Sequence, residues 1–165
     1  MICFIARHGH ALNVGEQGVT KDADRPLSIT GKKQITSVAK GLNQIGIKID
    51  FILCSPFKRT CETAQLYADI LNKDLKVIAS THLESGARFE NYKTAMEEYK
   101  LWQNYAKKNV MLIGHAPDVG KVVDALASLK GMQLDTGNIA QIQIENPDGP
   151  GIMTGFWSPS IFQQQ

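Results

Sequence analysis

Residues 2–9 read Ile-Cys-Phe-Ile-Ala-Arg-His-Gly, an apolar run of five residues that ends in an arginine, a histidine and a glycine. A short apolar run without alternation is typical of a strand buried on both faces of a parallel sheet. Phe51–Cys54 and Val110–Ile113 have the same form. Segments between these runs carry apolar residues at steps of three and four, which predict amphipathic helices. We therefore expect an α/β fold with a mostly parallel central sheet and helices on both faces.

Capping residues mark where two of the helices begin. Ser28 or Thr30 is expected to cap a helix that follows a long loop over residues 9–27. That loop holds Gly, Asn, Asp and Pro without a period. Ser55 is expected to cap the next helix, with Pro56 as its first residue.

The C-terminal part of the chain predicts a β-hairpin. Apolar residues alternate with glutamines over residues 140–144, residues 146–151 have turn composition, and residues 152–157 can form the returning strand. We expect a single domain over residues 1–160 and a short tail over residues 161–165, since domains commonly hold about 100–150 residues.

Charge and hydropathy argue against two classes of protein. The 165 residues include 18 Lys+Arg and 16 Asp+Glu, a net charge of +2, whereas non-specific nucleic-acid binding requires a basic patch. The longest charge-free run, residues 149–165, contains three Gly and two Pro and does not predict a membrane span. The N-terminus lacks a signal-peptide pattern and the three cysteines lack disulfide-framework spacing, so a cytoplasmic setting is expected.

Polar clusters follow all three buried runs. They are Arg7-His8-Gly9, the stretch Ser55–Thr60, and Gly114-His115-Ala116-Pro117. The carboxyl ends of parallel strands meet at one edge of a sheet, which is where ligands bind in such folds. The chain has 14 Lys but only four Arg, and three of these lie in the clusters or in the loop facing them. Because the planar fork of arginine suits bidentate capture of phosphate or carboxylate, we expect an anion site at this edge.

These motifs resemble the signature of the histidine phosphatase superfamily, which includes the phosphoglycerate mutases. The matching stretches are Arg7-His8-Gly9, Thr30-Gly31-x-x-Gln34, Ser55-Pro56-x-x-Arg59-Thr60-x-Glu62-Thr63-Ala64 and Gly114-His115-x-Pro117. Within the superfamily the chain is most similar to the small bacterial phosphohistidine phosphatases. That similarity rests on the short length, Arg25-Pro26-Leu27, Ser-Pro-Phe-x-Arg at residues 55–59, and the close of the hairpin in Trp157-Ser158-Pro159.

The resemblance implies a metal-independent phosphatase without a cofactor, in which His8 attacks phosphorus and becomes a covalent phosphohistidine. It implies that Arg7, Arg59 and His115 hold the phosphoryl oxygens. Arg25 and Asn13 are further candidates for phosphate binding, at the rim of the site. The expected substrate is phosphohistidine in proteins, because the 55 residues between Arg59 and His115 leave little room for a lid over a small molecule.

Two further residues are candidates for a part in the implied mechanism. Many superfamily phosphatases protonate the leaving oxygen with a carboxylic acid, and Glu84 is the best-placed candidate for that general acid. His10 stands where many relatives carry an acidic residue or Gln, so it either tunes the pocket or lines it.

Several alternatives remain open at this point. The protein could be a broad-specificity phosphomonoesterase acting on small phosphate esters, or a catalytically silent module that binds phosphoproteins. Intact Arg7, His8, Arg59 and His115 argue against silence, since binding alone requires no nucleophile. A zinc site built from the histidines at positions 8, 10 and 115 is disfavoured because the arginines would repel a cation. A phosphoglycerate mutase is disfavoured by the short chain.

Overall fold

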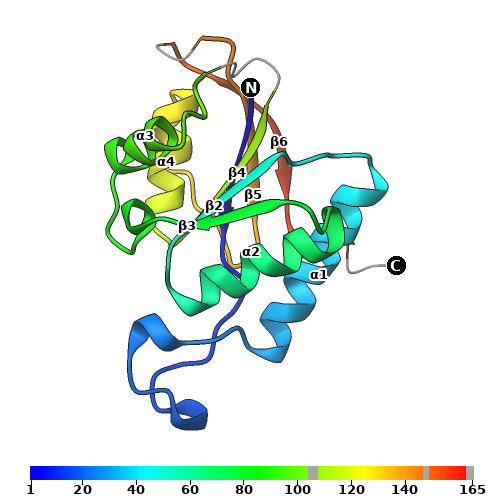
Figure 1. Ribbon diagram of the computed structural model, residues 1–165, viewed down its shortest axis with the longest axis vertical. Helices are drawn as coiled ribbons and strands as arrows, with labels where there is room; N and C mark the ends of the chain where they lie inside the picture. The colour runs from blue at the N-terminus through cyan, green and yellow to red at the C-terminus, as the bar shows by residue number, and fades with distance from the viewer. Residues whose placement is uncertain (104–107, 147–148, 163–165) are drawn as a thin grey trace.

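A computed structural model describes residues 1–103, 108–146 and 149–162 (Figure 1). Within these ranges, six strands and five α-helices follow one another with three short 3-10 turns between them. In chain order the elements are β1 (Ile2–Arg7), η1 (Glu16–Gly18), η2 (Asp22–Asp24), α1 (Ile29–Gln44), β2 (Phe51–Cys54), α2 (Lys58–Leu71), β3 (Lys76–Ala79), η3 (Thr81–Leu83), α3 (Phe89–Glu98), β4 (Asn109–Gly114), α4 (Asp118–Ala127), β5 (Ile139–Gln143), β6 (Ile152–Trp157) and α5 (Pro159–Phe162).

The strands form one sheet in the order β3-β2-β4-β1-β5-β6. Strands β1, β2, β3 and β4 all run parallel to one another. Strand β5 runs antiparallel to β1, and β6 runs antiparallel to β5. The predicted α/β fold, with a mostly parallel sheet and a C-terminal hairpin, is confirmed. The topology places the carboxyl ends of β1, β2 and β4 side by side.

Two apolar clusters cover the two faces of the sheet. Alternate residues of a strand point to opposite faces, and in β1 Phe4 packs toward α1 and α2 whereas Ile5 packs toward α3 and α4. Figure 1 shows α1 and α2 on one side of the sheet and α3 and α4 on the other. Burial on both faces explains why the central strands are continuously apolar.

The expected caps are right for one helix and wrong for the other. Ser28 caps α1, since its Oγ accepts a hydrogen bond from the Gly31 N–H at 3.0 Å. Ser55 does not cap α2, which begins at Lys58 after Phe57. The physical reason is that the Ser55 hydroxyl is bound to the ring of His115 at 2.9 Å, and Pro56 still lies in the turn that leaves β2.

The C-terminus differs in detail from the expected tail. Ile161 and Phe162 belong to α5, and the ring of Phe162 stacks on Trp157 with centroids 6.1 Å apart. Residues 163–165 of that tail lie outside the described residues. Among the residues described, no helix is both long enough and apolar enough to span a membrane.

The loop over residues 9–27 extends beyond the carboxyl edge of the sheet, where Figure 1 shows it as the blue excursion at the bottom. A bridge between Ala11 and Leu27 closes its neck. The far part holds η1 and η2. The loop therefore lies on the same side of the molecule as the three polar clusters.

Candidate active site

The ends of three strands enclose a cavity of about 340 Å³. The backbone joins them there: the His8 N–H donates to Gly114 O at 3.2 Å, and the Ser55 N–H donates to Ile113 O at 3.0 Å. The cavity is lined by Arg7, His8, His10, Ala11, Asn13, Asp22, Arg25, Arg59, Ser85, His115, Ala116 and Thr136. Six residues expected at the site, Arg7, His8, Asn13, Arg25, Arg59 and His115, are thus brought together.

His8 is buried, with one ring nitrogen fixed and the other directed at an arginine. Its Nδ1 lies 2.7 Å from Gly9 O, which can only accept, so Nδ1 carries the proton. Its Nε2 accepts from Arg59 Nε at 3.2 Å and therefore bears the lone pair. Burial lowers the pKa of His8 to about 4, opposed by the Gly9 hydrogen bond and reinforced by Arg59. A neutral imidazole with its lone pair on Nε2 is a competent nucleophile once an incoming phosphoryl group takes the place of the Arg59 contact.

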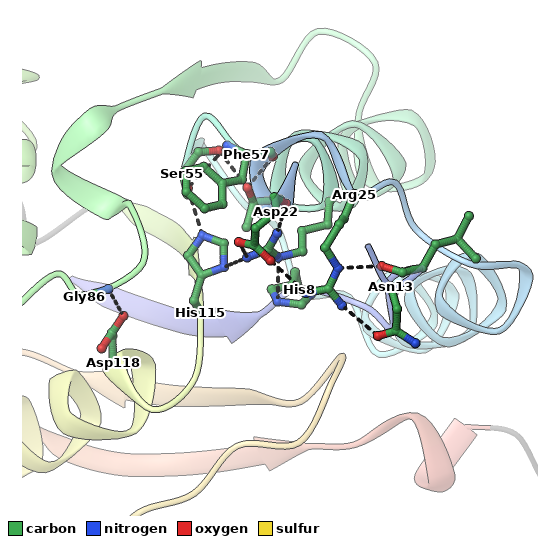
Figure 2. A network of polar contacts seen from close by, with 12 residues as sticks. His8, Asn13, Asp22, Arg25, Ser55, Phe57, Gly86, His115 and Asp118 are labelled. Atoms are coloured by element: carbon green, nitrogen blue, oxygen red, sulfur yellow. Dashed lines mark hydrogen bonds and ion pairs between the residues drawn. The ribbon is translucent and has the colours of Figure 1, made fainter. Parts of the chain in front are cut away.

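His115 is held in the opposite tautomer. Its Nδ1 accepts from Arg59 Nη2 at 3.1 Å, so its Nε2 donates to Ser55 Oγ at 2.9 Å. Burial, followed by the charge of Arg59, lowers the pKa of His115 to about 3. The rings of His8 and His115 meet edge-on with centroids 5.3 Å apart (Figure 2). The two histidines thus present their lone pairs to one guanidinium.

Two arginines approach this point, one from the start of α2 and one from the end of β1. Arg59, in the first turn of α2, is 4% exposed and contacts both histidines. Arg7, the last residue of β1, donates from Nη1 to Leu134 O at 2.9 Å, but its buried Nε has no hydrogen-bond partner among the described residues. Since buried N–H groups are nearly always paired, Arg7 Nε is a donor available to an anion in the cavity.

Arg25 and Asn13 come from the loop over residues 9–27 (Figure 2). Arg25 donates from Nε to Leu12 O at 2.5 Å, and its Nη2 lies 3.5 Å from Asn13 Oδ1. Its Nη1 pairs with Asp22 Oδ1 at 2.9 Å. Both residues line the cavity from its exposed side, and the side-chain oxygen of Asn13 is directed at Arg25.

Glu84 is not brought together with the other candidates. Its neighbour Ser85 lines the cavity, whereas Glu84 is absent from the lining residues. The segment is held by the Gly86 N–H, which donates to Asp118 Oδ2 at 2.7 Å (Figure 2).

His10 lines the cavity from the neck of the loop. Its ring Nδ1 lies 2.8 Å from Ser28 Oγ, and its backbone N–H donates to Gln34 Oε1 at 2.9 Å. Within the described ranges, no group of three His, Cys, Asp or Glu side chains is placed to hold a metal ion.

The histidine phosphatase superfamily (branch 1) matches residues 3–127 of this sequence. The chain belongs to this superfamily. The solved structure of the protein histidine phosphatase SixA complexed with tungstate is similar at 25% identity and a TM-score of 0.83, over 98% of this chain and 99% of that one. A protein from Agrobacterium tumefaciens assigned as a phosphohistidine phosphatase SixA has the same fold at 19% identity and a TM-score of 0.76, over 96% and 98% of the two chains.

A curated relative adds sequence similarity without a known activity. An uncharacterized protein of Picosynechococcus sp. is 29% identical over 128 residues, which are 77% of this chain and 73% of that protein. Superfamily membership and the SixA-like fold together support a phosphatase.

Other superfamily motif residues in this chain brace the site. Thr63 Oγ1 accepts from the Gly9 N–H at 3.2 Å, and Glu62 Oε2 accepts from the Leu27 N–H at 2.8 Å. Glu62 therefore binds the neck of the loop, and Arg59, three residues before it in α2, faces the cavity.

Two residues of this histidine phosphatase site were not predicted from the sequence. The sequence predicts Ser55 as a helix cap, whereas the structure makes it the partner of His115. Asp22 was not singled out, although it lies three residues before Arg25 and pairs with both Arg25 and Arg59. The spacing Asp22-x-x-Arg25 was the available signal, but its contact with Arg59 joins residues 37 apart.

Proposed function

We propose that this protein is a metal-independent phosphatase that forms a covalent phosphohistidine on His8 and acts on phosphohistidine in proteins. One observation carries the proposal: His8 Nε2, which bears the lone pair, lies 3.2 Å from the Nε of the buried Arg59 in a cavity open at its rim. Nucleophile and anion-binding group are thus in place together.

In the first step, the Nε2 lone pair of His8 attacks phosphorus and forms a P–N bond. The bond from phosphorus to the leaving nitrogen breaks, and its electron pair goes to that nitrogen. If the other nitrogen of the substrate ring carries a proton, the leaving group departs as neutral imidazole. Arg7 and Arg59 would stabilise the charge spread over the equatorial oxygens, and Gly9 O keeps the proton on Nδ1 throughout.

In the second step, water attacks the phosphorus of the phosphorylated His8. The bond between phosphorus and Nε2 breaks, its electron pair returns to Nε2, and both protons of the attacking water leave with inorganic phosphate. His8 is then regenerated in its original tautomer.

The acid–base character of the cavity supports phosphohistidine as substrate. Asp22 is the only carboxylic acid among the lining residues described. Its hydrogen bond from Arg25 and its contact with Arg59 hold the pKa of Asp22 below its usual value, so it stays ionised and has no proton to give. A phosphoramidate needs no such proton, whereas an alkyl phosphate leaves as a poor alkoxide and does. The similarity to SixA, a protein histidine phosphatase, points the same way.

A second candidate function, hydrolysis of small phosphate esters, is favoured by His10. Its ring lines the cavity and its Nδ1 is occupied by Ser28, which leaves Nε2 to exchange a proton with a leaving oxygen. His10→Gln would then slow alkyl phosphates by about 10²-fold or more and leave phosphohistidine unaffected. Glu84→Gln tests the general acid predicted from the sequence. We expect it to leave the rates on both alkyl phosphates and phosphohistidine unchanged, because Glu84 does not line the cavity.

The deciding experiment offers the purified protein a histidine-phosphorylated protein and a panel of alkyl and aryl phosphates. We expect the highest kcat/KM on phosphohistidine, inhibition by vanadate and no effect of EDTA. Higher efficiency on alkyl phosphates would favour the small-ester function. Binding of phosphoprotein without turnover would favour a silent module, and loss of activity in EDTA with recovery on adding a divalent metal would contradict the metal-independent mechanism.

A further inference from the structure

Asp22 lies on the exposed side of the cavity, and its carboxylate contacts two of the three arginines there. We propose that Asp22 is a positioning residue that orients the guanidinium of Arg59 toward the phosphoryl group and joins Arg25 to the same unit. This rests on the proposed phosphatase function.

The contacts of Arg59 divide between two edges of its planar guanidinium. The end edge is held by Asp22 alone: Nη1 donates to the backbone oxygen of Asp22 at 2.7 Å and Nη2 to its Oδ2 at 3.1 Å. The side edge faces the two histidines, with Nε 3.2 Å from His8 and Nη2 3.1 Å from His115. Asp22 thus accepts two hydrogen bonds from the end edge of the guanidinium, and the side edge remains directed at His8.

The same carboxylate fixes the position of Arg25. Asp22 Oδ1 accepts from Arg25 Nη1 at 2.9 Å (Figure 2). Its Oδ2 accepts from Arg59 Nη2, so one side chain bridges a loop arginine and a helix arginine. In the described part of the chain, Asp22 is the only carboxylate within ion-pair distance of either arginine. Three arginines and Asp22 give the cavity a net charge of +2 from these groups, which matches a phosphoryl dianion.

Burial indicates which partner orients the other. The side chain of Arg59 is 5% exposed, whereas that of Asp22 is 53% exposed. A buried arginine cannot turn to water for hydrogen bonds, so loss of Asp22 leaves its end edge without a carboxylate partner. A guanidinium displaced by about 1 Å costs about 10²-fold in rate at a site built on positioning.

A competing interpretation makes Asp22 an internal inhibitor that occupies the phosphate position in the free protein. The two interpretations predict opposite results. A positioning residue, when removed, lowers kcat and weakens anion binding. An internal inhibitor, when removed, frees the arginines, tightens anion binding and lowers KM. The geometry favours positioning, because Asp22 binds Arg59 at Nη1 and Nη2 and makes no contact with Nε, the donor that faces His8.

The test uses Asp22→Asn, with Asp24→Asn as a matched control that removes the same charge from the same short turn, η2. Folding is checked by thermal denaturation, and kcat and KM are measured on a histidine-phosphorylated protein. Asp22→Asn should lower kcat about 10- to 100-fold with a smaller change in KM, and Asp24→Asn should match the wild type. In an Arg59→Lys background, Asp22→Asn should cost less than twofold more, since lysine has no fork to orient.

Orthovanadate binding to the wild type and both variants provides a readout that does not depend on turnover. Weaker vanadate binding in Asp22→Asn but not in Asp24→Asn supports the proposal even if no phosphorylated substrate is hydrolysed, in which case only the proposed function fails. Unchanged kcat and vanadate affinity in Asp22→Asn, tighter vanadate binding, or a full additional loss in the Arg59→Lys background would each overturn it.

Discussion

The strand ends and the loop over residues 9–27 both contribute to the cavity, but they are held in place by different contacts. His8 is fixed by the sheet and its extension, since its N–H donates to Gly114 O and its carbonyl accepts from the Gly137 N–H. The loop is fixed by side chains of α2: Glu62 binds the Leu27 N–H, and Arg59 binds Asp22. His8 and His115 are buried and Arg7 is half-buried, whereas Asn13 and Asp22 are exposed. The rigid region suits the reacting atoms, and the loop suits the rim that meets the substrate.

The largest expected effect is at the strand end of β1. His8→Ala removes the proposed nucleophile and should reduce phosphohistidine hydrolysis to the uncatalysed rate, while circular dichroism shows an intact fold. Retained turnover in this variant would contradict the covalent mechanism and would mean that residues outside the strand ends carry the reaction.

The arginines should come next. Arg59→Lys and Arg7→Lys keep the charge but remove the fork, and each should lower kcat about 10²–10³-fold, as the loss of one transition-state donor does. Arg88→Lys is the control, because Arg88 does not line the cavity. Arg25→Lys, in the loop, should lower kcat less than either Arg7→Lys or Arg59→Lys. An equal or larger loss there would remove the distinction between the two regions.

The strand-end histidines also predict how stability depends on pH. Both have folded-state pKa values lowered by burial, to about 4 for His8 and about 3 for His115. Between these values and the ordinary imidazole value of about 6.5, the unfolded chain binds more protons than the folded one, so stability rises with pH. Urea unfolding from pH 4 to 7 should show this rise, and His8→Ala should reduce its slope by about one proton. An unchanged slope would mean that His8 is charged in the folded protein.

Two serines that each bind a histidine give the smallest expected effects. Ser55→Ala at the strand end should lower kcat about tenfold, because His115 loses the acceptor that fixes its tautomer. Ser28→Ala in the loop neck should mainly lower the free energy of unfolding, by about 1 kcal/mol, through loss of the α1 cap. Kinetics and urea unfolding of both variants test the contrast, which would fail if Ser28→Ala had the larger kinetic effect.

The same contrast explains what could be predicted from the sequence. Arg7, His8, Arg59 and His115 adjoin apolar strands, so parallel strand order alone predicts that they converge. The loop has no such rule, because its shape depends on contacts with α2. Asp22 therefore could not be placed against Arg59, and Glu84 was expected at the cavity when Ser85 lines it instead. The preference of serine for helix N-termini predicts a cap at Ser55, and that preference cannot reveal a hydrogen-bond partner 60 residues away.

The central claim is that His8 attacks through Nε2, and trapping the intermediate tests it most directly. The protein would be mixed rapidly with a ³²P-labelled phosphohistidine protein, quenched in base, digested and analysed by mass spectrometry and ³¹P NMR. We predict an acid-labile, base-stable phosphate on His8, attached at Nε2 because Gly9 O holds the proton on Nδ1. Phosphate on Nδ1, on another residue, or on no residue while turnover proceeds would contradict the mechanism.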